Sequence, residues 1–321
     1  MSLDEIKDSG AAGGAVAARA PEATKTARAG FPWLAAGITV CLAICCGLLL
    51  KIAYRAGRDL PFFRVDASQS LPVQFPEWLP REWIAEAKFR ISERNNFSVF
   101  DDAAIEALRQ DLQKLPWVKS VRESDRGLPR TLKLAITPRT PIALVETKTS
   151  LILVDSDGVV LPPAVFPADR LDSLPRIVKW RGEFTDPDAG VRWENDAVLD
   201  GISVALLLPQ LYFHQLLNID PGFRVSRIDV SNCGGVLDRR ETEILLITNT
   251  GVKIKWGRAP RSAKFGELTP DQKFKNLARI LEEYAGLGGV GAINLRFDQA
   301  DVFDAQGQWI PRPALLSQAV R

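Results

Sequence analysis

Residues 31–50 have the sequence FPWLAAGITVCLAICCGLLL, a run of 20 residues without a charged side chain. As a helix rising about 1.5 Å per residue, this run would cross the roughly 30 Å hydrocarbon layer of a bilayer. Trp33 and Tyr54 suit the two membrane–water interfaces, and Lys51 can extend its charge into water. The pattern predicts a membrane-spanning helix over residues 31–54. A cleaved signal peptide and a buried core helix are the alternatives, although the first has a shorter apolar core and the second usually a polar side.

Composition limits the classes of protein to which the chain can belong. With 321 residues and a prior of roughly one domain per 150 residues, two folded units with appendages are expected. The hydrophobic fraction of 46% and the charged fraction of 25% are typical of globular chains. A net charge of +2 creates no strong positive field, so nucleic acid is not an expected partner. Three of the four cysteines lie in the apolar run, so no disulfide or cysteine-based metal site is expected.

A tail and a small folded domain are predicted on either side of the apolar run. Residues 1–30 are rich in Ala and Gly and nearly lack large apolar side chains, so we expect a disordered tail. Residues 61–140 are predicted to fold in the order β-α-α-β-β, an α+β module with one sheet covered by two helices. Asp101 is a suitable N-cap for the second helix. Hydrophobic periodicity places the strands at 62–66, 118–123 and 131–137 and the helices at 81–90 and 102–115.

A second folded domain, rich in strands, is predicted over residues 141–305. Asn249 to Gly251 suit a hairpin turn. Two helices are expected to flank an antiparallel sheet, one at 196–208 and one that begins at the N-cap Thr269. Residues 306–321 are expected to form a C-terminal tail. The predicted strands are 142–147, 151–154, 159–161, 176–180, 224–230, 244–249, 252–256 and 292–297.

Six short motifs follow one another along the two predicted domains. They are Leu115-Pro116-Trp117-Val118, Leu128-Pro129-Arg130, Thr137-Pro138-Arg139-Thr140-Pro141, Leu153-Val154-Asp155, Trp256-Gly257-Arg258 and Asn294-Leu295-Arg296-Phe297. In this order they resemble the FtsQ/DivIB cell-division family, and the resemblance covers residues 31–300. Members of that family have a short cytoplasmic tail, one membrane helix, a POTRA module of β-α-α-β-β order and a β-rich domain. The order of parts is the same as that predicted from the residues.

The resemblance implies a bacterial division scaffold that links cytoplasmic and periplasmic division proteins at the septum by protein–protein binding. It places the chain in the inner membrane as a single-pass protein with a cytoplasmic N-terminus and periplasmic domains. Basic residues on both sides of the apolar run leave this orientation open on charge alone. The POTRA module implies docking of other division proteins, and the lipid bilayer is contacted through one helix.

The resemblance also implies that the far end of the β-rich domain binds a pair of the FtsB/FtsL type. The binding mode would be addition of a strand to an open sheet edge, whose unpaired N–H and C=O groups can capture an extended segment. We expect this edge at residues 292–303. The expected partner contacts are Arg296, Phe297, Val302 and Phe303. A closing core strand with an ordinary surface arginine is the alternative interpretation.

Carboxylates in the second domain offer a few candidates for chemistry. Asp155 to Gly158 form an Asp-x-Asp-Gly run, a pattern also found in phosphatase nucleophiles and calcium loops. A phosphatase motif needs a parallel strand that leads into a helix, whereas two short strands are predicted around this run. Ser, Asp and Gly suit a hairpin turn without any chemistry. Asp298, Asp301 and Asp304 are irregularly placed for calcium.

Nucleophilic catalysis is not indicated either. His214 is the single histidine and lies in the apolar segment LYFHQLL, where a packing role is favoured. Cys233 lies in a turn-like Asn-Cys-Gly-Gly segment without a basic neighbour to activate its thiol. We therefore expect no enzyme activity, no cofactor and no metal site. Two other function hypotheses stay open: a POTRA-bearing outer-membrane assembly or transport factor, and a membrane-tethered hydrolase.

Overall fold

The structure, a computed structural model, divides into two compact units, Met1–Gly57 and Arg58–Arg321. Each unit is described by itself. The N-terminal tail predicted over residues 1–30 and His214 lie outside the described residues. The residues described are 32–58, 60–65, 73–94, 97–164, 166, 171–182, 186–211, 222–262, 266–284 and 287–311.

A single long helix, α1 (Pro32–Arg58), makes up the described part of the first unit. Its stretch Ala36–Gly57 has 22 residues and is long and apolar enough to cross a membrane. At about 1.5 Å per residue, a stretch of this length covers roughly the hydrocarbon core of a bilayer. None of it is buried inside the protein. The helix predicted from the apolar run is therefore confirmed, and a buried core helix does not account for it.

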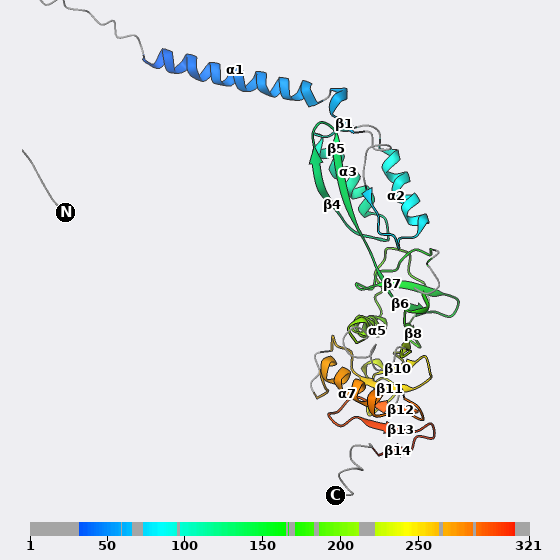
Figure 1. The fold of residues 1–321 in the computed structure, drawn as a ribbon. Coiled ribbons are helices and arrows are strands. Elements are labelled where there is room, and N and C mark those ends of the chain that lie inside the picture. The colour runs from blue at the N-terminus through cyan, green and yellow to red at the C-terminus, as the bar shows by residue number, and fades with distance from the viewer. Residues whose placement is uncertain are drawn as a thin grey trace, which may run out of the picture. The chain divides into compact units, whose positions relative to one another are not determined.

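The second unit begins with a small α+β module, residues 64–138, built on a three-stranded sheet of order β2-β5-β4. β2 (Val73–Gln74) is parallel to β5 (Thr131–Pro138), and β4 (Val118–Gly127) is antiparallel to β5. The helices α2 (Arg81–Glu93) and α3 (Asp102–Gln113) follow β2 in the chain. Figure 1 shows α3 between α2 and the strand β4. The sheet strands and helices thus have the predicted order β-α-α-β-β.

The first strand of that sheet differs from the prediction of 62–66. In the structure Pro61–Phe63 forms a short 3₁₀ helix, η1, and Arg64–Val65 (β1) pairs with Phe97–Ser98 (β3) in a separate two-stranded sheet. Pro61 favours the start of a helical turn, because its ring fixes φ and it lacks an N–H donor. The first strand of the three-stranded sheet is instead β2, which pairs with β5 on the side opposite β4. β2 has only two residues, too few to show an alternating pattern.

Local signals for the second helix of this module are confirmed. The Asp101 carboxylate accepts a hydrogen bond from the Ala104 N–H at 3.2 Å and so caps α3. Leu108 and Leu112 on α3 are buried against Trp117 in the module's core. Trp117 stacks on Trp83 of α2, with ring centroids 5.6 Å apart. The amphipathic face expected for this helix therefore packs on the sheet.

The rest of the unit is organised around a nine-stranded sheet of order β14-β13-β12-β11-β10-β9-β8-β6-β7. An antiparallel sheet was predicted, but this sheet is mixed: β8 is parallel to β6 and β9, and β12 is parallel to β11. Parallel neighbours need a crossover connection. Helices α5 and α6 lie in the connection from β8 to β9 and α7 in the connection from β11 to β12, whereas β6 is followed by β7 before the chain reaches β8. The strands are β6 (Pro141–Glu146), β7 (Leu151–Asp155), β8 (Arg176–Val178), β9 (Val225–Asp229), β10 (Ile244–Thr248), β11 (Lys253–Gly257), β12 (Ala292–Asn294), β13 (Asp301–Phe303) and β14 (Trp309–Ile310).

Helices α5 (Asp196–Ala205), α6 (Leu208–Leu211) and α7 (Pro270–Glu283) accompany this sheet. The helix predicted over 196–208 is thus divided into two. Thr269 forms the predicted capping box with Gln272, so the start of α7 is confirmed. The strand predicted at 159–161 is instead a pair of single bridges, Val159 to Arg192 and Val160 to Val154. Apolar side chains of the sheet and of α5, α6 and α7 form one continuous core.

Candidate protein-binding site

Among the described strands, β14 is the last one at this end of the sheet, which corrects the edge predicted at residues 292–303. β12 is hydrogen-bonded to β11 on one side and to β13 on the other, and β13 lies between β12 and β14. Both strands of the predicted segment are therefore internal. The chain turns back after β13 because Asp304 accepts hydrogen bonds from the Gln306 and Gln308 N–H groups at 2.9 and 2.7 Å. This Asp-Ala-Gln-Gly turn is visible in the sequence, but the residues after 305 were assigned to a tail.

Strand β14 presents the open border of the sheet. Ile310 pairs with Val302, and Trp309 pairs with Phe303. Within the ranges that the structure describes, no further strand pairs with the other side of β14. The Trp309 side chain is 55% exposed, which is unusual for so large an apolar group. An exposed aromatic side chain on an open sheet edge is typical of a strand-addition site.

The four predicted contact residues differ in their accessibility. Val302 is fully buried in the core, so it cannot touch a partner and serves the packing of β13. Phe303 is partly buried, and Phe297 is 51% exposed. The Arg296 guanidinium lies over the Phe297 ring, 5.3 Å from its centroid. Arg296, Phe297 and Phe303 therefore remain candidates.

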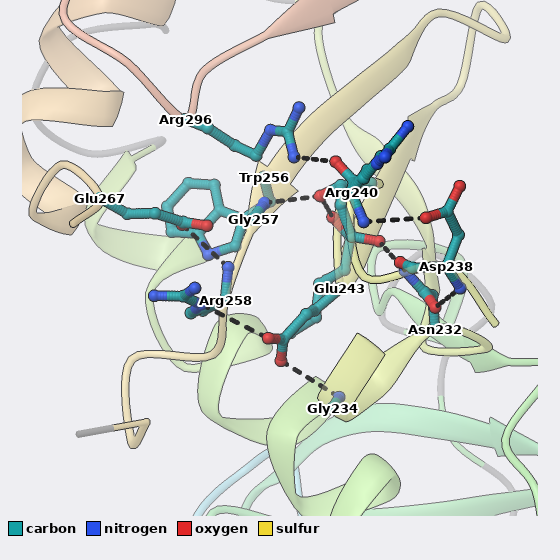
Figure 2. A network of polar contacts seen from close by, with 12 residues as sticks. Asn232, Gly234, Asp238, Arg240, Glu243, Trp256, Gly257, Arg258, Glu267 and Arg296 are labelled. Atoms are coloured by element: carbon teal, nitrogen blue, oxygen red, sulfur yellow. Dashed lines mark hydrogen bonds and ion pairs between the residues drawn. The ribbon is translucent and has the colours of Figure 1, made fainter. Parts of the chain in front are cut away.

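Two hydrogen bonds fix the direction of the Arg296 side chain. Its Nε donates to Asn294 Oδ1 at 3.1 Å. Its Nη1 donates to the Arg240 carbonyl at 3.0 Å, as Figure 2 shows. Asn294 itself is nearly buried in β12. Because one acceptor is a backbone carbonyl and the other belongs to a buried side chain, the guanidinium is oriented before any partner arrives. Pre-organisation of this kind reduces the entropy lost on binding.

The loop that carries the Arg240 carbonyl is ordered by one buried side chain, Asn232. Its Nδ2 donates to the carbonyls of Asp238 and Thr242, and its Oδ1 accepts from the Leu237 and Asp238 N–H groups. Figure 2 shows Asn232 beside Asp238. All four distances are between 2.8 and 2.9 Å. A buried amide that uses donors and acceptors together strongly restricts the loop around it. Asn232 was not identified from the sequence, where it looks like an ordinary turn residue.

An ion pair between Lys273 and Glu267 lies next to the segment that carries Arg296. Lys273 on α7 is 3% exposed; its Nζ donates to the Trp256 carbonyl at 2.6 Å and to Glu267 Oε2 at 2.9 Å. Burial lowers the pKa of the Lys273 ammonium, and the Glu267 carboxylate opposes that shift. Gly257 has φ +100°, and a Cβ there would overlap the Glu267 carboxylate. The Leu268 N–H in turn donates to the Arg296 carbonyl at 3.4 Å.

The Asp-x-Asp-Gly run has a structural role. Asp155 is buried; its Oδ1 accepts from the Asp157 and Val159 N–H groups at 2.9 and 2.8 Å. Its Oδ2 accepts from Arg139 Nη1 at 2.6 Å. The carboxylate therefore shapes the turn after β7 and binds the guanidinium of the segment between β5 and β6. In the part of the chain described by the structure, no group of three or more His, Cys, Asp or Glu side chains could hold a metal ion.

The Cys233 thiol has an environment that opposes nucleophilic chemistry. Burial, together with the carboxylates of Asp200 and Glu243, raises its pKa to about 12. A reactive cysteine needs the reverse, an electropositive setting that stabilises the thiolate. The thiol therefore remains protonated near neutral pH.

The chain was compared with known proteins. No protein-family model matches the chain. The chain is 47% identical over 55 residues to a protein from Novosphingobium aromaticivorans named "Cell division protein FtsQ". The chain is similar to FtsQ. The matched segment is 17% of this chain and 17% of the FtsQ relative, so the chain matches far less than two thirds of that protein's length. The family resemblance seen in the motifs is thereby supported by a curated relative.

Proposed function

We propose that the chain is a bacterial division scaffold of the FtsQ type. The similarity to FtsQ carries this proposal, and the fold supports it through one exposed apolar helix followed by a three-stranded and a nine-stranded sheet. In this function α1 crosses the inner membrane once, with the N-terminus in the cytoplasm and residues 58–321 in the periplasm. The protein acts by holding other division proteins at the septum, without catalysing a reaction.

The binding mode proposed for the second sheet is strand addition to β14. An extended partner segment, supplied by a pair of the FtsB/FtsL type, would pair with the backbone of Trp309 and Ile310. Trp309 and Phe297 offer large exposed apolar surfaces, and Arg296 offers a fixed guanidinium. Aromatic residues and arginine carry most of the binding free energy in many protein interfaces. The partner segment is thus expected to present apolar side chains and an acceptor for Arg296.

The first module is proposed to be a POTRA module that docks further division proteins. Its support is the order β2-α2-α3-β4-β5 and the three-stranded sheet on which the helices pack. A role in outer-membrane assembly or transport is not favoured by any particular feature of the described residues.

The scaffold function is tested by depletion of the protein in its own host, with imaging of septa and of a fluorescently tagged chain. We expect filamentous cells and a tagged protein enriched at midcell. Normal septation together with a uniform membrane signal would refute the proposal.

The strand-addition mode needs a separate test with surface variants. Phe297→Asp should weaken co-purification of partner proteins and leave the thermal unfolding midpoint in place, because the side chain is half exposed. Leu151→Asp is the matched control, since Leu151 is 45% exposed and starts β7 at the opposite end of the sheet. Equal partner recovery with the two variants would exclude Phe297 from the binding surface.

A further inference from the structure

A short turn at the start of the second unit exposes two large apolar side chains in fixed positions. η1 (Pro61–Phe63) follows the end of α1 within a few residues. Phe62 is 64% exposed and Leu60 is 51% exposed. Solvation of such side chains by water is unfavourable, and exposed apolar groups that lie together mark a contact surface.

The outward direction of these side chains follows from how the turn is attached. Phe63 packs inward, edge-to-face against Phe100 with ring centroids 5.2 Å apart. Its carbonyl accepts a hydrogen bond from the Val99 N–H at 2.9 Å. Phe62 meets the edge of the Phe63 ring, with ring centroids 5.3 Å apart, and is still 64% exposed. The exposure is therefore a property of the folded turn.

Part of the backbone of the turn is paired internally. Pro61 has no N–H group, the Phe63 N–H donates to the Leu60 carbonyl at 3.0 Å, and the Arg64 N–H donates to the Pro61 carbonyl. Backbone groups without partners are costly in a medium that contains little water. Internal pairing of these groups makes the turn compatible with the polar border of a bilayer.

The covalent connection to α1 determines what lies near the turn. Phe62 is four residues beyond Arg58, the last residue of α1, and a fully extended chain covers at most about 3.6 Å per residue. Phe62 therefore stays within roughly 14 Å of the helix end, and Leu60 within about half that distance. Each headgroup layer is about 5–7 Å thick beyond the hydrocarbon core. Both side chains are therefore tethered close to the point where α1 would leave the membrane.

The charged residues around the turn also favour contact with a lipid surface. Arg55 on the last turn of α1 and Arg64 directly after η1 are both exposed, so basic groups precede and follow the apolar pair. Basic residues next to apolar or aromatic ones are typical of segments that lie at the surface of anionic membranes. We propose that Leu60 and Phe62 insert into the headgroup region of the bilayer and form a second, interfacial contact between the protein and lipid. This inference rests on the proposed membrane crossing of α1.

Photo-crosslinking of the full chain in lipid nanodiscs tests the proposal. The photoreactive residue p-benzoylphenylalanine would replace Phe62 in one variant and Phe89 in another, in nanodiscs of phosphatidylcholine and phosphatidylglycerol. Phe89 on α2 is the matched control, because it is 60% exposed in the same module but far along the chain from α1. Leu48 within α1 is the positive control. Lipid adducts would be measured by mass spectrometry.

We expect lipid adducts at positions 48 and 62, with a yield at 62 several-fold above that at 89. Adducts at 48 combined with equal yields at 62 and 89 would overturn the interfacial contact while leaving the membrane crossing intact. Lack of adducts at 48 would instead refute the membrane crossing of α1, and with it both proposals. Removal of the anionic lipid phosphatidylglycerol should lower the adduct yield at position 62. An unchanged yield would refute the claim that Arg55 and Arg64 attract this segment to anionic lipid.

Discussion

The ammonium of Lys273 lies 2.9 Å from the Glu267 carboxylate; the Lys273 side chain is 3% exposed and that of Glu267 16%. The pair joins α7 to the end of β11, because Glu267 Oε2 also accepts a hydrogen bond from the Arg258 N–H at 2.9 Å. An ion pair at this depth rarely adds much stability in total, but loss of one partner leaves the other charge buried and uncompensated. This relationship therefore makes the region around Arg296 sensitive to single substitutions.

Replacement of Lys273 is expected to be costly. Lys273→Met should lower the free energy of unfolding by about 3–5 kcal/mol, because the Glu267 carboxylate would lose its partner. Urea denaturation of the purified chain measures this change. Lys275→Met on the same helix is the control, since Lys275 is exposed and its loss should change little. Equal effects of the two substitutions would contradict the importance of the pair.

Gly257 and Gly251 form a matched pair for testing steric overlap. Both have positive φ, +100° and +89°, but a Cβ meets the Glu267 carboxylate at Gly257 and nothing within 4 Å at Gly251. Gly251→Ala should cost only the left-handed strain, about 1–2 kcal/mol. Gly257→Ala should cost about 1–3 kcal/mol more, because overpacking adds to that strain. Thermal unfolding of the two variants compares these costs, and identical midpoints would refute the overlap.

Trp309 is expected to matter for binding more than for folding. Trp309→Ala should weaken binding of the strand-donating partner by about 2 kcal/mol, roughly 30-fold in Kd, because a large exposed aromatic contact is removed. Its unfolding midpoint should change little, since over half of the side chain is already in solvent. Isothermal titration calorimetry with the co-purified partner provides the measurement. Unchanged affinity would exclude β14 as the docking edge.

Asp229 should contribute to acid sensitivity. Burial raises the pKa of its carboxyl group, but hydrogen bonds from Lys179 and Ser231 outweigh burial and hold the pKa below the usual value of 3.8. The folded state therefore binds the proton less readily than the unfolded chain, so the contribution is present above pH 3.8 and is lost as pH falls through the folded pKa.

Denaturation of the wild type and of Asp229→Asn over a series of pH values tests this linkage. The asparagine variant cannot titrate at this position. The difference in stability between the two proteins should be largest near neutral pH and shrink in acid. A difference that stays constant with pH would contradict the lowered pKa.

Much of the local structure could be predicted because its causes lie within a few residues. The spanning helix follows from an uncharged run, the start of α3 from the Asp101 cap, and the start of α7 from the Thr269 capping box. These signals depend on neighbouring side chains and the backbone beside them. The motifs that resemble FtsQ are likewise local, and a curated relative agrees with them.

The strands that were missed or misplaced share a different cause. β2 and β14 have two residues each, too few for a pattern, and they are strands because of the partners that they meet. β1 was given to the wrong sheet, since its pairing with β3 joins segments about 30 residues apart. Local alternation says that a segment can pair but does not say with which strand.

The candidate binding site likewise has one part that local sequence predicted and one part that depends on tertiary structure. Phe297 and Arg296 were identifiable from their motif, and both lie at the surface. The border of the sheet was a matter of tertiary structure, because the turn at Asp304 returns the chain and lets β14 cover β13. Hydrophobic periodicity depends only on residues that are close in sequence, so the sequence alone specifies helices, strands and a membrane span. Which strand keeps a free edge is decided only when distant segments have exchanged their hydrogen bonds.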